Sequence, residues 1–148
     1  MSSDAKVAKD LVETLKDGQK GFAASAEKLA DSDRPEWAAT MTRLQQQRTQ
    51  FTQEIVGLGH EYGDDVDESG SVLGTLHRGW LSLKDALTGD DPSGVLGAAV
   101  TGEDHTVSEY EKALADTDLS DGFRTVLQRQ HSEIVDARAE VKALHSAS

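Results

Sequence analysis

The sequence predicts an all-α protein: an antiparallel four-helix bundle with an extra helix in a long crossover between helices 2 and 3. Apolar side chains recur at alternating steps of three and four residues in five segments, which is the spacing of one helical face. Four of these segments are long and of similar length, and the remaining one is shorter. With 148 residues, the chain has material for one ordinary domain and its core, so we expect a single domain over residues 1–148.

The first two predicted helices span about 4–30 and 35–62. The stripe of the first consists of Ala8, Leu11, Leu15, Gly18, Phe22, Ser25 and Leu29. Residues 31–35 end this helix and offer acidic and hydroxyl caps before a proline in the first turn of the next. The second helix carries an unbroken four-three repeat in which Arg48 is the charged member. Because the linker is short, we expect the two helices to be antiparallel neighbours.

The other predicted helices span about 71–88, 92–115 and 120–146. An acidic cap followed by Pro92 begins the second of these, which is a common start for a helix. The shorter segment, 71–88, follows the second long helix and precedes the third. A bundle with one long crossover has its connecting chain at this point in the sequence, and that distribution of elements is the ferritin-like arrangement.

Polar residues interrupt the apolar stripes near the middle of the long helices. They are Gln19, Arg48, Glu103 and Gln130. Mid-helix positions of an antiparallel bundle share one layer, so we expect these four side chains to form a structural polar layer. A buried charge without a partner is costly, so Arg48 is expected to pair with Glu103, and the two amides to fill the remaining hydrogen bonds.

Ferritin-like di-iron proteins bind metal in this layer, through a Glu from each of two helices and a Glu-x-x-His from each of the other two. None of the five histidines has an acidic residue three positions before it, since those positions are Gly57, Gly74, Gly102, Gln128 and Lys142. A guanidinium group in the layer would also repel a cation. We therefore expect no cofactor. The alternative is Fe or Mn bound by a reduced ligand set drawn from Glu54, Glu103, Glu133 and His131.

The composition argues against several classes of function. There are 27 acidic and 15 basic residues, and a net charge of -12 repels nucleic acid and anionic lipid. The chain contains no cysteine, which excludes thiol chemistry, and it has no nucleophile-elbow or phosphate-loop motif. No apolar run has the length of a signal peptide or a membrane span, so we expect a cytoplasmic protein.

Several minor features have a simple structural interpretation. His105 and Glu109 have the spacing of a surface metal site and also of a solvated helical pair. His77 is a packing residue or a ligand. Trp80 occupies a stripe position and is expected to be a core residue. The acidic loop 63–70 lacks the spacing of a calcium loop; it is a solvated connection or a docking site for a basic protein.

Several strings of residues occur in a characteristic order. They are 17–22, Arg48 with Phe51, 69–80, 83–89, 102–104 and 129–130. Together they resemble the bacterial DUF2383 family, which implies a ferritin-like four-helix bundle without an established biochemical role. Family members often carry Glu at the position of Gln19 and His at that of Arg138, so this chain lacks two potential ligands, while Glu54 and Glu103 match carboxylate positions that remain.

The functional expectation is therefore a non-enzymatic, stress-related or structural bundle that acts through its surface, with a homo-oligomer as a family-level expectation. The alternative is a metal-dependent oxidase of di-iron type, or an iron-handling protein, with a reduced ligand set. The sequence names no protein partner.

Overall fold

The computed structural model describes residues 3–61, Trp80 and 91–148, and over these residues the protein is α-helical. The helices are α1 (Ser3–Ala30), α2 (Glu36–Glu61), α4 (Pro92–Leu114) and α5 (Asp121–Ala147). The four long helices predicted from the apolar repeats are thus present. No helix in this part of the chain is long and apolar enough to cross a membrane.

Some sequence predictions fall elsewhere in the chain. The predicted crossover helix at 71–88 lies outside the described residues, apart from Trp80. The acidic loop 63–70 and His77 lie outside them as well. The fold described below is therefore that of the four long helices together with one side chain from the connection between α2 and α4.

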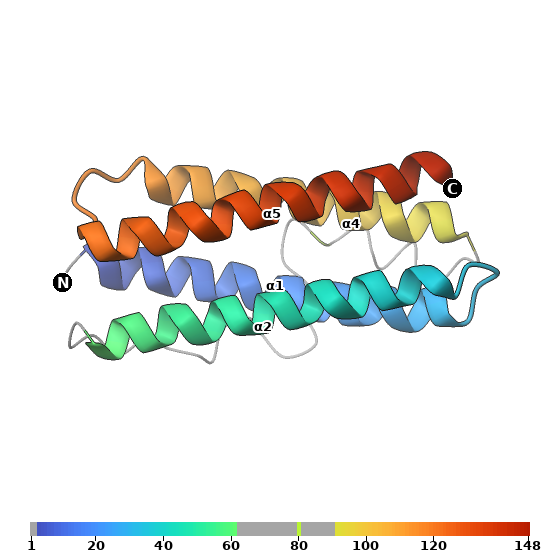
Figure 1. The fold of residues 1–148 in the computed structure, drawn as a ribbon, viewed down its shortest axis with the longest axis horizontal. Coiled ribbons are helices and arrows are strands. Elements are labelled where there is room, and N and C mark those ends of the chain that lie inside the picture. The colour runs from blue at the N-terminus through green and yellow to red at the C-terminus, as the bar shows by residue number, and fades with distance from the viewer. Residues whose placement is uncertain (1–2, 62–79, 81–90) are drawn as a thin grey trace.

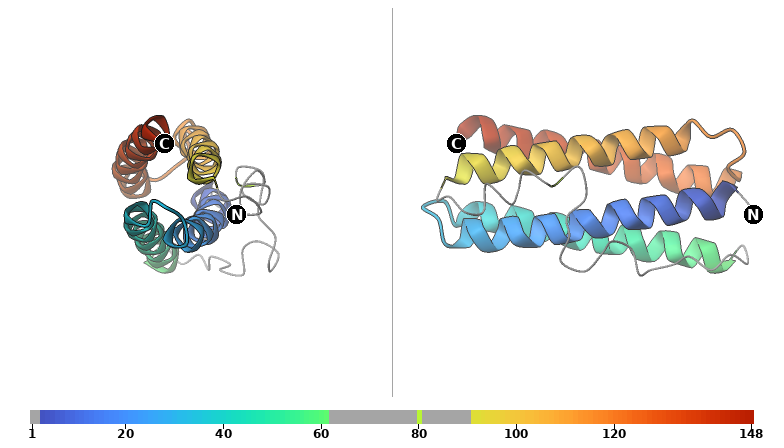
Figure 2. Two further views of the ribbon diagram at one scale, coloured as in Figure 1. Left: turned by 90° about the vertical axis from the view of Figure 1, so that its right-hand side faces the viewer. Right: turned by 180° about the vertical axis from the view of Figure 1, so that it is seen from behind.

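The four helices form a bundle in which chain neighbours α1 and α2 are antiparallel, as are α4 and α5 (Figure 1). Viewed along the bundle, the order around the axis is α1, α2, α5, α4, so that α2 and α4 lie diagonally opposite each other (Figure 2). Helix α4 begins at the end of the bundle opposite to the one where α2 finishes. The two helices therefore run in the same direction, which is the topology of a bundle with one long crossover.

Helix ends are held by side chains that satisfy free backbone groups. The Asp91 carboxylate accepts a hydrogen bond from the backbone N–H of Ser93 at 3.0 Å, with Pro92 in the first turn of α4. The Ser120 hydroxyl caps α5, and the backbone N–H of Ser120 donates to Asp4 at 2.9 Å. The turn between α4 and α5 is thereby tied to the start of α1.

The apolar core is divided into two clusters by a polar level in the middle of the bundle. One cluster lies near the start of α1 and includes Leu11, Leu15, Phe51, Ile55, Tyr110, Leu127 and Ile134. The other includes Phe22, Leu29, Met41, Leu44, Trp80, Leu96, Ala99, Ala137 and Val141. Arg48 lies between the two clusters on α2 and Glu103 between them on α4. The polar level is therefore enclosed by apolar side chains at both ends.

The four seams between neighbouring helices are not equally close. Helices α1 and α2 pack most extensively, followed by α4 with α5 and by α1 with α4, whereas α2 and α5 make the fewest contacts. The α2–α5 seam is instead bridged by charged side chains, including Arg43 with Glu140 and Arg129 with Glu54. The bundle thus has three closely packed seams and one that is wider and polar.

Candidate functional site

Arg48 of α2 and Glu103 of α4 form an ion pair across the centre of the bundle. The side chains of both residues are 0% exposed. The two terminal guanidinium nitrogens donate to the two carboxylate oxygens, at 2.5 Å and 2.6 Å, which is the bidentate geometry preferred between arginine and carboxylates. Because α2 and α4 lie diagonally opposite each other, an ion pair between them crosses the bundle axis. The structure thus contains the ion pair expected from the sequence.

The remaining surface of the Arg48 guanidinium is also in contact with protein groups. Its Nε donates to Oε1 of Gln47 at 3.1 Å. Its Cζ lies 5.2 Å from the centre of the Phe22 ring, within range of a cation–π interaction. A Cβ built on Gly18 would lie 3.7 Å from Cγ of Arg48, so the Arg48 stem packs against the α1 backbone. Hydrogen bonds and the ring thereby replace the water lost by this buried charge.

Gln19 lies beside the main chain of Arg48. Its Nε2 donates to the hydroxyl of Thr52 at 2.9 Å and approaches the carbonyl oxygen of Arg48 at 3.5 Å. The Thr52 hydroxyl in turn donates to that same carbonyl at 2.9 Å. Gln19 therefore links α1 to α2 at the level of the ion pair, through groups other than the guanidinium and the Glu103 carboxylate.

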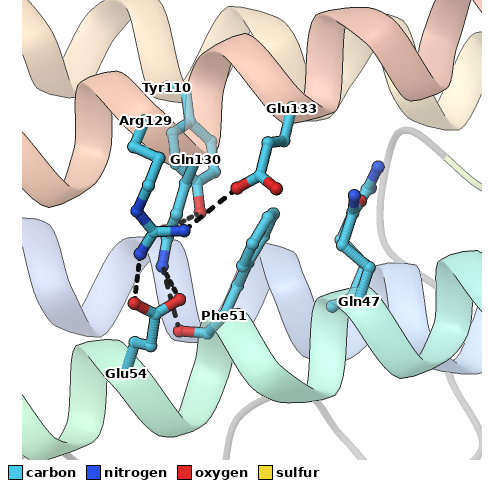
Figure 3. A network of polar contacts seen from close by, with 8 residues as sticks. Gln47, Phe51, Glu54, Tyr110, Arg129, Gln130 and Glu133 are labelled. Atoms are coloured by element: carbon cyan, nitrogen blue, oxygen red, sulfur yellow. Dashed lines mark hydrogen bonds and ion pairs between the residues drawn. The ribbon is translucent and has the colours of Figure 1, made fainter.

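Gln130 belongs to a second polar cluster, with Tyr110, Glu54 and Arg129 (Figure 3). This cluster lies beside the apolar cluster near the start of α1, which contains Phe51, Leu127 and Ile134. Its Oε1 accepts a hydrogen bond from the hydroxyl of Tyr110 at 2.7 Å, and its Nε2 lies 3.3 Å from Oε1 of Glu54. On α5 the boundary between the two apolar clusters falls between Ile134 and Ala137, one to two helical turns beyond Gln130. Of the four polar residues expected in one layer, Gln19, Arg48 and Glu103 thus lie at the level of the ion pair. Gln130 lies at a second level, nearer the start of α1.

The Tyr110 hydroxyl is fully buried, and burial is the main reason that its pKa is raised well above the ordinary value of 10.0. The neighbouring Glu54 carboxylate also raises this pKa, whereas Arg48 and Arg129 act in the opposite direction. Tyr110 is therefore a neutral hydrogen-bond donor at physiological pH. A tyrosine in an apolar stripe requires a buried partner for its hydroxyl, and this was the signal in the sequence that could have located the second cluster.

The second cluster continues to the surface through Arg129. Figure 3 shows its guanidinium between the carboxylates of Glu54 and Glu133. These three side chains are 49%, 39% and 46% exposed, respectively. They line a cavity of about 270 Å³ in the α2–α5 seam. Its other lining residues are Arg43, Gln46, Gln47, Gln50 and Phe51.

The four metal-ligand candidates do not converge on one point. Glu103 is held by Arg48, whereas Glu54 and Glu133 share Arg129. His131 faces α4, where its Nε2 lies 3.8 Å from a Glu111 carboxylate oxygen. Over residues 3–61, Trp80 and 91–148, no group of three or more His, Cys, Asp or Glu side chains is arranged to hold a metal ion. Since arginine already pairs with each of the three candidate carboxylates, the candidates that the structure describes do not form a di-metal centre.

A second guanidinium lies near the level of the ion pair. Arg138 of α5 forms an ion pair with Asp104, the residue that follows Glu103 on α4. Arg138 directly follows Ala137, at the boundary between the two apolar clusters. Its side chain is 35% exposed and that of Asp104 is 51% exposed, so this pair lies at the surface of the α4–α5 seam. The middle of the bundle thus carries one buried and one partly exposed arginine–carboxylate pair.

His105 and Glu109 line a hollow of about 300 Å³ between α1 and α4. The other residues of its lining are Asp10, Glu13, Thr14, Asp17 and Lys112. This surface is mostly acidic, in keeping with the net charge of the chain. His105 and Glu109 lie about one turn apart on the same side of α4, as their four-residue spacing in the sequence requires.

The fold and the site define a class of protein: a four-helix bundle whose middle is closed by a buried guanidinium–carboxylate pair. The chain matches the family described as domain of unknown function DUF2383 over residues 5–116, which is more than half of its length, and it belongs to that family. Comparison with curated proteins gives no match. Helix α5 lies beyond the matched residues, so the match does not extend to Arg129, Gln130 or Arg138.

Proposed function

We propose that this protein is a non-enzymatic, ferritin-like bundle in which arginine occupies the place of the metal cation. Its role is structural or stress-related, and it acts through its surface. The observation that carries the proposal is the bidentate contact between Arg48 and Glu103, both fully buried in the middle of the bundle. A guanidinium there supplies the positive charge that a carboxylate in this position otherwise obtains from a metal ion.

The topology supports the ferritin-like assignment. The parallel directions of α2 and α4 require the single long crossover that is typical of ferritin-like bundles. The Arg138–Asp104 pair adds a second guanidinium near the same level. Two carboxylates of α4 are thus paired with arginines from α2 and α5.

The surface of the bundle is the part available for interaction. The net charge of -12 disfavours nucleic acids and anionic membranes as partners and is compatible with a cytoplasmic protein. We propose that the chain forms a small homo-oligomer. Light scattering at several protein concentrations tests this part of the proposal, and a mass equal to one chain at every concentration would contradict it.

The test of the main proposal is a metal analysis of the protein purified from cells grown with added iron, followed by thermal unfolding with Fe(II) or Mn(II). We expect metal far below one equivalent per chain. We also expect the same unfolding temperature with and without metal, because a ligand that binds only the folded state would raise it. One or more equivalents of metal that resist a chelator, together with a metal-dependent rise in unfolding temperature, would support the iron-handling alternative instead.

A further inference from the structure

The indole of Trp80 fills a slot in the seam between α1 and α4. A Cβ built on Gly21 of α1 would lie 2.3 Å from the ring, and one built on Gly102 of α4 would lie 2.2 Å from it. Real side-chain atoms do not approach so closely, so the ring fits only because both positions are glycine. Glycine in the middle of a helix is unfavourable by about 0.5–1 kcal/mol relative to alanine. The close approach of Trp80 is the physical reason for glycine at both sites.

The slot holds the indole by shape and apolar contact. Trp80 is 1% exposed, and its ring meets that of Phe22 edge-to-face, with the ring centres 5.0 Å apart. The indole N–H is buried and has no acceptor among the described residues. Tryptophan N–H groups usually find a partner when buried, whereas the described residues around this ring contact it without a hydrogen bond to its N–H.

The slot is adjacent to the central ion pair. Phe22 contacts the Trp80 ring and also lies under the guanidinium of Arg48. On α4, Gly102 directly precedes Glu103, the other member of the ion pair. The indole therefore packs against Phe22 and Gly102, which adjoin the two members of the ion pair.

We propose that this slot, formed by Gly21, Phe22 and Gly102, is a binding site for flat, bicyclic aromatic groups, and that the chain occupies it with its own Trp80. The site recognises the outline and the apolar faces of the ring system. It is independent of any role for the surface of the bundle.

The first test uses the intact chain and the fluorescence of Trp80. The sequence has two tryptophans, so Trp37→Phe leaves Trp80 as the single emitter. We expect blue-shifted emission and weak quenching by acrylamide. Adding Gly102→Ala should shift the emission to the red and produce a several-fold rise in the quenching constant, because the new methyl group occupies the space of the ring.

The matched controls are alanine substitutions at two other helical glycines. A Cβ at Gly57 would meet no atom within 4 Å, and one at Gly18 would make only ordinary contacts with Arg48. Neither change should alter the emission or quenching of Trp80. Strong quenching in the parent protein, or equal effects of Gly102→Ala and Gly57→Ala, would overturn the proposal.

The second test supplies the aromatic group from solution. We expect indole to bind Trp80→Ala and to raise its unfolding temperature, or to restore its helical circular dichroism if this variant is unfolded. Benzothiophene, which has nearly the same outline and lacks the N–H, should bind at least as tightly, because Gly21, Phe22, Gly102 and the other described residues offer the N–H no acceptor. The double variant Trp80→Ala with Gly102→Ala should bind neither compound.

Absence of any effect of either compound on Trp80→Ala would contradict the binding site. It would mean that α1 and α4 close over the space left by the ring. Tighter binding of indole than of benzothiophene would overturn the claim that the site recognises shape alone.

Discussion

Two of the arginine–glutamate clusters in the bundle, that of Arg48 and that of Arg129, differ chiefly in their access to water. Arg48 and Glu103 are fully buried, whereas Arg129, Glu54 and Glu133 are between 39% and 49% exposed. In the first cluster a lost partner leaves a charge in an apolar core. In the second, water replaces the partner and salt screens the attraction. Removing one partner is therefore expected to lower the free energy of unfolding strongly in the buried cluster and only slightly in the exposed one.

The largest expected effect comes from breaking the buried pair. Glu103→Ala leaves the Arg48 guanidinium without its carboxylate and should lower the free energy of unfolding by about 3 kcal/mol or more. Urea denaturation followed by circular dichroism measures this loss. A loss near zero would show that water reaches the pair.

Replacing both partners shows whether the loss of stability in Glu103→Ala comes from the lost attraction or from the buried, unpaired charge of Arg48. Arg48→Met combined with Glu103→Leu removes both charges and fills similar space, so most of the loss in Glu103→Ala should be recovered. Stability close to that of the parent is the expected result. If the double variant were as unstable as the single one, packing at these positions would matter more than charge.

Tyr110 tests the buried part of the second cluster through pH. Because burial raises its folded-state pKa, the hydroxyl contributes stability that is fully present below pH 10 and is lost as the pH rises above that value. By pH 11 the parent should lose about 1.4 kcal/mol through this group. The comparison with Tyr110→Phe isolates the contribution, because the phenylalanine variant lacks it. Parallel pH profiles of the two proteins would contradict the assignment.

The smallest effect is expected at the surface of the α2–α5 seam. Glu133→Ala removes one half-exposed contact with Arg129 and should cost less than about 1 kcal/mol. The difference from the parent should shrink further at high salt, as urea denaturation in 1 M sodium chloride can measure. A loss as large as that of Glu103→Ala would remove the contrast between the two clusters.

The sequence was sufficient to predict the four long helices and most of their core-facing residues. The four-three repeat identifies the buried face of each helix, and a single charged residue in that face needs a partner of opposite charge. Since Arg48 and Glu103 are the charged seam residues of α2 and α4, their pairing could be anticipated.

The axial position of α5 could not be predicted in the same way. A repeat within one helix does not define how far that helix is shifted along its neighbours. In the structure the level of the ion pair passes α5 between Ile134 and Ala137, so Gln130 joins Tyr110 and Glu54 instead. The resemblance to the family marks Arg138 only as a replaced ligand position. Its contact with Asp104 depends on this shift of α5.

The most direct test of the account is a crystal structure with anomalous scattering data, from protein prepared with Fe(II) or Mn(II). We predict that Arg48 remains bidentate on Glu103 and that no anomalous peak lies between α2 and α4. A metal peak on the Glu103 carboxylate, with the Arg48 side chain displaced, would contradict it.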